Sequence, residues 1–189
     1  MPYTPAQQRL LDLLRERAVK RGEFVLSSGQ KSNYYIDGRL VTLDGEGARA
    51  VAEAILEKIR ELELAGAPQV AAVGGLTMGA DPIAGACAAI SAVLGRPRRA
   101  FIVRKETKKH GTQKLVEGPL AAGEHVVIVE DVVSTGASAI QAAASVREMG
   151  CHVTAVITLV DREMGGPEEM AKAGLRYIPL FTKTELLAG

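Results

Sequence analysis

The stretch VVIVEDVVSTGASA, residues 126–139, places three kinds of residue in succession. Its first four residues are apolar and predict a buried strand, and Glu130 and Asp131 follow them directly. A turn of small residues then leads into a helix that we expect to begin near Ala137. Because ligands of open parallel sheets bind at the carboxyl ends of the strands, this pattern predicts a ligand site at the corner between strand and helix.

The rest of the chain repeats this alternation of strand and helix. Short apolar runs predict strands at residues 70–73, 100–103, 125–129, 152–160 and 175–180, and alanine-rich segments predict helices at 80–93, 137–149 and about 167–173. Continuous apolar strands that alternate with helices are typical of a parallel sheet covered on both faces. The predicted fold class is therefore α/β, with a central, mostly parallel sheet flanked by helices.

Helices are also predicted outside this alternation. Thr4 and Gln7 have the spacing of a capping box, as do Thr182 and Glu185 before a short terminal helix. A long helix is expected from about residue 44 to residue 64. The apolar stripe of the first helix consists of Leu10, Leu11, Leu14 and Ala18.

Composition limits the class of protein. The chain has 189 residues, which suits one domain, and its core must be aliphatic because 47% of the residues are hydrophobic but only 4% are aromatic. A net charge of +1 argues against nucleic-acid binding through an overall basic surface. No apolar run reaches transmembrane length, the N-terminus has no signal-type run, and Cys87 and Cys151 are expected to be reduced thiols. We therefore expect a cytoplasmic protein that binds neither membranes nor nucleic acid.

Two stretches interrupt the alternation, residues 22–39 and residues 104–124. The second begins with RKETKKHG, in which several cations gather beside a single glutamate. A loop of this length in a compact domain is usually a lid, a binding loop or disorder, and a charge run is often only a solvated surface.

The residues of the strand-to-helix corner suggest what kind of ligand binds there. The turn offers hydroxyls and unhindered backbone N–H groups at a helix start, which suits a phosphate, whereas the carboxylates would repel a phosphate and suit sugar hydroxyls. The simplest ligand that satisfies both is a sugar phosphate. Alternatively, Glu130 and Asp131 merely end a strand and Ser134 caps the helix.

VVIVEDVVSTGASA resembles the phosphoribosyl-pyrophosphate signature of the type I phosphoribosyltransferases. Four further motifs resemble the orotate phosphoribosyltransferases among them: the hood segment FVLSSGQKSNYYIDGR, the pyrophosphate loop GGLTMGADPIA, the loop RKETKKHG and the segment DREMGG. The resemblance extends from about residue 22 to residue 185. It departs from some relatives at Ser27 and at Thr77–Met78, where those relatives carry basic or aromatic residues.

The resemblance implies a fold, a reaction and partners. It implies a single domain over residues 1–189 with a hood made mainly of residues 1–40 and the C-terminal segment, and a mobile catalytic loop at about 104–120. The implied reaction transfers the 5-phosphoribosyl group from phosphoribosyl pyrophosphate to N1 of orotate, giving orotidine 5-phosphate and pyrophosphate in pyrimidine (UMP) biosynthesis. The implied cofactor is Mg²⁺, held mainly by the substrate with Glu130 and Asp131 as protein contacts. The implied assembly is a homodimer with shared active sites.

The resemblance also assigns roles to individual residues. Those with implied catalytic roles are Lys108, His110, Arg104 and Asp131. Those implied to bind orotate are Ser134, Arg162, Tyr35 and Ile36. Those implied to bind phosphoribosyl pyrophosphate are Arg104, Lys105, Lys108, His110, Glu130, Asp131, Val132, Val133, Ser134, Thr135, Gly136, Ala137 and Ser138.

Other interpretations remain open at this point. A lone arginine after a strand, such as Arg162, can simply form a surface ion pair with Asp161 or Glu163. A purine phosphoribosyltransferase would share the signature at 130–138, although it gives no reason for Arg162. A non-catalytic regulator that senses phosphoribosyl pyrophosphate would also keep the fold.

Overall fold

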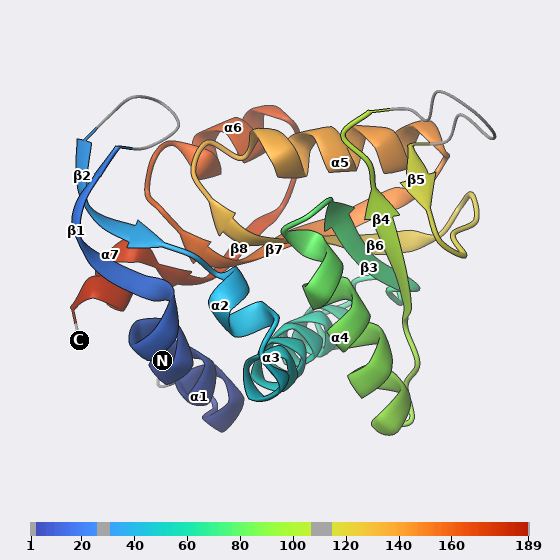
Figure 1. Cartoon of the computed structure of the whole chain (residues 1–189). Coiled ribbons are helices and arrows are strands. Elements are labelled where there is room, and N and C mark those ends of the chain that lie inside the picture. The colour runs from blue at the N-terminus through green and yellow to red at the C-terminus, as the bar shows by residue number, and fades with distance from the viewer. Residues whose placement is uncertain (1–2, 26–30, 107–114, 189) are drawn as a thin grey trace.

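The computed structural model describes residues 3–25, 31–106 and 115–188. Its centre is a six-stranded sheet with the strand order β5-β4-β3-β6-β7-β8 (Figure 1). Neighbouring strands are parallel except for β4 and β5, which are antiparallel. The strands are β3 (Ala72–Leu76), β4 (Arg99–Val103), β5 (Val116–Glu117), β6 (His125–Val133), β7 (His152–Asp161) and β8 (Tyr177–Thr182).

Helices cover both faces of this sheet, which confirms the predicted α/β class. Figure 1 shows α5 and α6 on one face and α1, α3 and α4 on the other. Each layer has its own buried cluster, one around Ile55 and Ile157 and one around Phe101 and Val146. The helices are α1 (Pro5–Leu13), α2 (Arg39–Thr42), α3 (Gly45–Leu64), α4 (Ala80–Val93), α5 (Ala137–Glu148), α6 (Gly166–Lys172) and α7 (Lys183–Leu187), with a π-helical turn η1 (Leu14–Ala18) after α1.

The local signals for helix starts are confirmed. Thr4 and Gln7 form a capping box at α1, and Thr182 and Glu185 form one at α7. Asp44 caps α3 by accepting hydrogen bonds from two backbone N–H groups. The predicted stripe of the first helix is buried, although its last residues, Leu14 to Ala18, are π-helical.

Strand β6 differs from its predicted end at residue 129. It continues to Val133, so that Glu130 and Asp131 lie within the strand and not after it. Pairing with β7 explains the extension, because Glu130 aligns with Thr158 and Val133 with Asp161. The backbone pairing of β6 with β7 outweighs the low preference of acidic residues for strands. The strands predicted at 70–73 and 175–180 are likewise displaced, to Ala72–Leu76 and Tyr177–Thr182.

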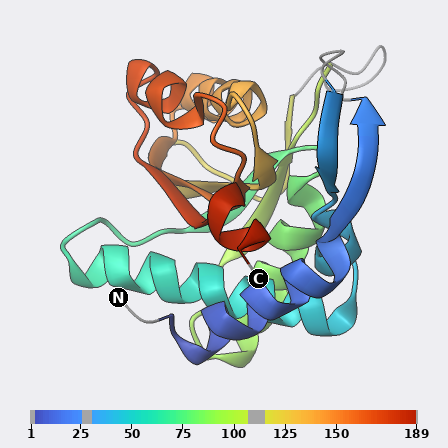
Figure 2. The ribbon, with the colours of Figure 1, turned by 90° about the vertical axis from the view of Figure 1, so that its left-hand side faces the viewer.

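Residues 22–39 contain regular structure that the sequence pattern did not predict. Strands β1 (Val19–Val25) and β2 (Lys31–Ile36) form an antiparallel hairpin, seen in Figure 2 as a ribbon separate from the main sheet. The rings of Phe24 and Tyr35 pack across it with centroids 5.7 Å apart. A register shift between Arg21 and Phe24 interrupts the pairing, and this bulge explains why the strand period was not visible.

The second irregular stretch is described only in part. Residues 107–114 lie outside the described residues, and Val116–Glu117 forms the short edge strand β5. As for the membrane, none of the helices in the described ranges is both long and apolar enough to cross it.

Candidate active site at the carboxyl edge of the sheet

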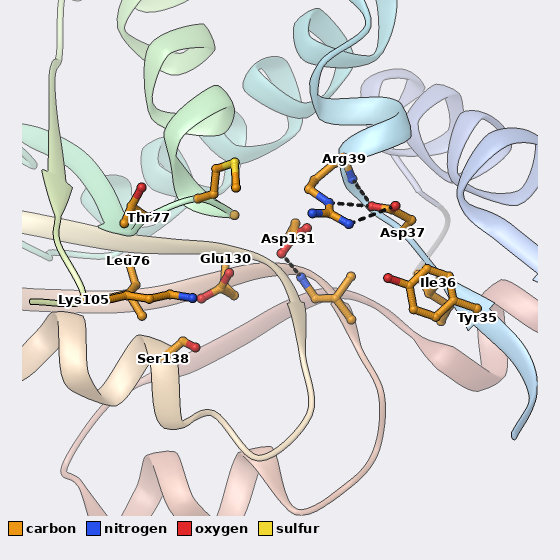
Figure 3. A pocket seen from close by; sticks show the side chains of 13 residues that line it. Tyr35, Ile36, Asp37, Arg39, Leu76, Thr77, Lys105, Glu130, Asp131 and Ser138 are labelled. Carbon is orange, nitrogen blue, oxygen red and sulfur yellow. Dashed lines mark hydrogen bonds and ion pairs between the residues drawn. The ribbon is translucent and has the colours of Figure 1, made fainter. Parts of the chain in front are cut away.

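A cavity of about 290 Å³ opens where β3 and β6 end, below the end of β2 (Figure 3). It brings together segments from the hairpin, the loop after β3, the stretch after β4 and the strand β6. The lining residues are Tyr35, Ile36, Asp37, Arg39, Leu76, Thr77, Met78, Gly79, Lys105, Glu130, Asp131, Val132 and Ser138. The predicted acidic pair therefore lies in a cavity, whereas of the predicted turn at residues 134–138 only Ser138 lines it, and Thr135 and Ala137 line a second hollow.

The two acidic side chains form the floor of this cavity. Glu130 is 8% exposed, and burial, reinforced by the neighbouring Asp131, raises its pKa to about 8. Burial also raises the pKa of Asp131, opposed by a hydrogen bond that Asp131 Oδ1 accepts from the Val132 N–H at 2.8 Å. Glu130 Oε2 is buried and has no hydrogen-bond partner among the described residues. A ligand that donates hydroxyls to this pair would supply the missing partners.

Two backbone segments, at Gly38 and Gly79, approach the acidic pair closely. A Cβ at Gly79 would lie 2.8 Å from Asp131 Oδ1 and closer still to Glu130 Oε1. A Cβ at Gly38 would lie 3.0 Å from the Cβ of Asp131. The loop after β3 and the turn after β2 therefore flank the carboxylates directly.

The turn between β6 and α5 has the features of an anion site. Gly136 is the N-cap of α5 and adopts the left-handed conformation, with φ 87°, and no side chain caps the helix. The first-turn N–H groups and the positive end of the helix dipole are thus available for an anion. The alternative in which Ser134 caps the helix is not observed. Thr135, Ala137 and Ser138 are exposed, and Val133 is buried beneath the turn.

Arg162 lies beside this turn. Its N–H donates to Val133 O at 2.8 Å, and its Nη1 lies 3.4 Å from Ser134 Oγ. Its Nε and Nη2 are buried and have no hydrogen-bond partner among the described residues. The guanidinium also lies 5.9 Å from the centre of the Tyr34 ring. Unpaired, converging donors of this kind suit a planar carboxylate.

The alternative role for Arg162, a surface ion pair, is not observed in the described part of the chain. Asp161 Oδ1 accepts from the Glu163 N–H at 2.7 Å. The Glu163 carboxylate faces α7, where it accepts from the N–H and hydroxyl of Thr184 and lies 3.4 Å from Lys183 Nζ. Glu163 itself has φ 58°, a conformation unusual for a residue with a side chain.

The two described cations of the basic stretch, Arg104 and Lys105, lie in different surroundings. Lys105 lines the cavity, and Figure 3 shows its side chain pointing toward Glu130. Arg104 is not among the lining residues, and its Nη1 lies 4.0 Å from Glu117 on β5. Lys108 and His110 lie outside the described residues. Tyr35 and Ile36 also line the cavity.

Sequence reasoning assigned no role to Asp37 and Arg39, although both line the cavity. The signal was available, because both belong to the hood segment that ends in YYIDGR. What the sequence did not show is that this segment lies against Asp131.

The acidic pair can hold a metal ion only with help from a ligand. Carboxylate oxygens suit a hard cation such as Mg²⁺, and the unpartnered Glu130 Oε2 is such an oxygen. However, no group of three or more His, Cys, Asp or Glu side chains placed to hold a metal occurs among the described residues. The site therefore fits a metal that takes most of its ligands from the substrate.

Comparison with known proteins identifies the family. Residues 43–175 match the model of the phosphoribosyl transferase domain. The orotate phosphoribosyltransferase of Synechocystis is 48% identical over 182 residues, covering 96% of this chain and 88% of the relative. That of Streptomyces coelicolor is 44% identical and covers 97% of this chain and 98% of the relative.

A solved structure agrees with this similarity. The Mycobacterium tuberculosis orotate phosphoribosyltransferase in complex with 5-phospho-alpha-D-ribosyl 1-diphosphate superposes with a TM-score of 0.75 at 36% identity, covering 96% of this chain and 99% of that one. With the carboxylate pair, the anion turn and Arg162 in place, these matches show that the chain belongs to the orotate phosphoribosyltransferases of the phosphoribosyl transferase domain family.

Proposed function

We propose that this site transfers the 5-phosphoribosyl group of phosphoribosyl pyrophosphate to N1 of orotate, with inversion at C1. The observation that carries the choice of orotate is the guanidinium of Arg162, whose Nε and Nη2 are buried and unpaired among the described residues. Orotate carries a carboxylate that would satisfy both donors, whereas neutral purine bases carry none.

The sugar phosphate would lie across the corner between β6 and α5. Its 5-phosphate accepts hydrogen bonds from the turn at residues 134–138, and its 2- and 3-hydroxyls donate to Glu130 and Asp131. Ser134, which lies next to Arg162, contacts the base as well. The backbone of Tyr35 and Ile36 covers the base from the hairpin side.

Loss of pyrophosphate leaves negative charge on the departing group, and cations of the chain must stabilise it. Lys105, which lines the cavity, and Arg104, which precedes Lys105 in the sequence, are two such cations. We assign the same stabilising role to Lys108, and we assign to His110 the role of proton donor to the leaving pyrophosphate. Orotate reacts as its N1 anion, having lost the N1 proton to solvent, and the bond from C1 to the pyrophosphate oxygen breaks as the bond from N1 to C1 forms. The pyrophosphate leaves with its charge balanced by these side chains.

We further propose that the reaction depends on Mg²⁺. When bound, the ion neutralises charge on the pyrophosphate oxygens. Glu130 and Asp131 are the side chains that would contact it, by direct bonds or through water, because their oxygens line the cavity. An assay of orotate absorbance with and without Mg²⁺ and phosphoribosyl pyrophosphate tests this proposal. Turnover that is unchanged by removal of the ion with a chelator would contradict it.

Base selectivity provides the sharpest test of the proposed function. The variant Arg162→Ala should raise the KM for orotate about 10- to 100-fold, since a hydrogen bond to a charged group contributes about 1.5–3 kcal/mol. Arg162→Lys keeps the positive charge but loses the planar pair of donors, so its affinity for orotate should lie between those of the wild type and Arg162→Ala. Orotate should be compared with hypoxanthine, adenine and uracil. Turnover of a purine alone would overturn the proposed substrate.

We also propose a homodimer in which the basic loop of one subunit serves the site of its partner. The support is that the stretch resumes in β5 (Val116–Glu117), which is the last strand at one edge of the sheet. Mixing the Lys108→Ala protein with the Asp131→Asn protein should restore part of the activity. No recovery after demonstrated subunit exchange would argue against shared sites.

Finally, we propose that the enzyme works in the cytoplasm. Cys87 and Cys151 are both free and buried, as is usual in a reducing compartment. Fractionation of cells that express the protein, with a cytoplasmic and a membrane marker, tests this.

A further inference from the structure

We propose that Arg39 binds the pyrophosphate moiety of the substrate, on the side of the cavity away from Lys105. This inference rests on the proposed function, because it assigns a ligand for one part of phosphoribosyl pyrophosphate. It is supported by the orientation of the Arg39 side chain, by its position in the cavity and by the charges of the other described lining residues.

Arg39 is held in a fixed orientation by Asp37. Its Nε donates to Asp37 Oδ1 at 2.8 Å and its Nη2 donates to Asp37 Oδ2 at 3.1 Å. The Arg39 N–H also donates to Asp37 Oδ1, at 3.2 Å. The two side-chain hydrogen bonds use one edge of the guanidinium and leave Nη1 without a partner among the described residues. A guanidinium held in place binds an anion with little further loss of side-chain entropy.

The position of Arg39 separates it from the 5-phosphate turn. Figure 3 shows Arg39 and Thr77 on one side of the acidic pair and Ser138 on the other. The close approaches of Gly38 and Gly79 to Asp131 agree with this arrangement, since each flanks the carboxylates. A ribose with its hydroxyls on the carboxylates and its 5-phosphate in the turn directs its C1 substituent away from the turn. The C1 substituent of phosphoribosyl pyrophosphate is the pyrophosphate.

Few cations are available to an anion in this cavity. The described lining residues include three acidic side chains, Asp37, Glu130 and Asp131, but only two cations, Arg39 and Lys105. The loop after β3 presents Leu76, Thr77 and Met78, which carry no charge. The Arg39 side chain is 44% exposed, so a ligand can reach it, whereas Asp37 is 17% exposed and remains behind it. A pyrophosphate in this cavity would therefore meet Arg39 as a preformed cation.

Binding measurements on three ligands test the proposal. Isothermal titration calorimetry with Mg²⁺ present should compare pyrophosphate, phosphoribosyl pyrophosphate and orotidine 5-phosphate on the wild type and on Arg39→Ala. We expect the dissociation constants of the first two to rise about 10- to 100-fold, in line with the loss of a charge-assisted hydrogen bond. Orotidine 5-phosphate has the ribose hydroxyls and the 5-phosphate but no pyrophosphate, so its dissociation constant should change less than about twofold.

Matched variants separate a ligand contact from a structural role. Arg49→Ala removes an exposed ion pair with Glu53 on α3, away from the cavity, and should leave all three affinities unchanged. Asp37→Asn keeps the cation and loosens its grip, so pyrophosphate affinity should fall less than in Arg39→Ala. Arg39→Lys keeps a charge in case the alanine variant folds poorly, and it should bind pyrophosphate at an affinity between those of the wild type and Arg39→Ala.

Two outcomes would overturn the proposal. An equal loss for orotidine 5-phosphate would mean that Arg39 acts on the ribose site through Asp131, and unchanged pyrophosphate affinity in Arg39→Ala would exclude the contact. These results are distinct from failure of the proposed function, which would appear in the wild-type protein as a lack of orotate turnover.

Discussion

The turn at residues 134–138 and the stretch at residues 104–106 are both expected to bind phosphate groups, but they are built differently. The turn joins a central strand to a helix, and its left-handed Gly136 packs on buried Met170. The stretch follows β4 near the edge of the sheet, and Arg104 faces Glu117 instead of the cavity. We therefore expect the ribose-phosphate side of the site to be preformed, and we expect the basic stretch on the leaving-group side to rearrange when substrate binds.

The largest effects should arise on the side that rearranges. Replacing His110 or Lys108 by alanine should lower kcat about 10²- to 10⁴-fold, the usual contribution of a positioned acid or base, with little change in KM. These groups act on charge that develops only as the bond to pyrophosphate breaks. Steady-state kinetics with orotate measures both constants. If kcat survives in both variants, the loop does not perform the chemistry and the comparison fails.

The preformed side should be visible in the pH dependence of stability. Burial raises the pKa of Glu130 from its ordinary value of 4.5 to about 8 in the folded protein, so between these values the folded state holds a proton that the unfolded state has lost. Stability is therefore lost as pH rises between these values, by up to about 5 kcal/mol for the full shift of Glu130. Below about pH 4.5 Glu130 is protonated in both states, and its titration no longer changes the stability.

The variant Glu130→Gln isolates this contribution, because glutamine keeps the shape and cannot ionise. Urea unfolding should show the variant and the wild type close in stability near pH 4 and the variant more stable near pH 9 by a few kcal/mol. A constant difference across this range would show that Glu130 is not held protonated by burial.

A smaller effect is expected when the turn is strained. Gly136→Ala forces a side chain into the left-handed conformation and places a Cβ 2.7 Å from Met170 Cε, which should cost about 1–3 kcal/mol and raise the KM for phosphoribosyl pyrophosphate. Gly95 is the control, because it has φ 71° with nothing within 4 Å of a Cβ. Gly95→Ala should lower Tm by about 2–4 °C for each kcal/mol without changing KM. Equal KM values in the two variants would remove the turn from substrate binding.

The smallest effect should come from releasing Arg104. Glu117→Gln removes its partner at 4.0 Å, and exposed ion pairs contribute only about 0–1 kcal/mol. The KM for phosphoribosyl pyrophosphate should therefore fall, by about fivefold at most. The double variant Glu117→Gln with Arg104→Ala should lose this gain. A rise in KM on Glu117→Gln would indicate that the glutamate positions Arg104 for binding instead of restraining it.

The sequence predicted best what depends on neighbouring residues. The capping boxes at Thr4 and Thr182 involve atoms within four residues of each other, so their spacing is sufficient to predict them. The acidic pair and its small-residue turn also lie in one segment, but of the turn only Ser138 lines the same cavity as the pair, and Thr135 and Ala137 line a second hollow.

The sequence failed where the partner lies far along the chain. The extension of β6 through Asp131 depends on its pairing with β7, and the hairpin β1–β2 depends on packing across a bulge. The approach of Gly38 to Asp131 places Arg39 in the cavity, and no local pattern encodes that contact. Arg104 is a further example, because the basic motif alone does not reveal that one of its cations, Arg104, pairs with Glu117.

The contacts of Glu163 connect α7 to the segment that carries Arg162. Glu163 follows Arg162 directly, and its carboxylate is fastened to the first turn of α7 through Thr184 and Lys183. We therefore expect α7 to restrain the backbone that carries Arg162 through its contacts with Glu163. Any fusion or truncation that loosens these contacts should first reduce the enzyme's discrimination among bases, before it lowers the stability of the fold.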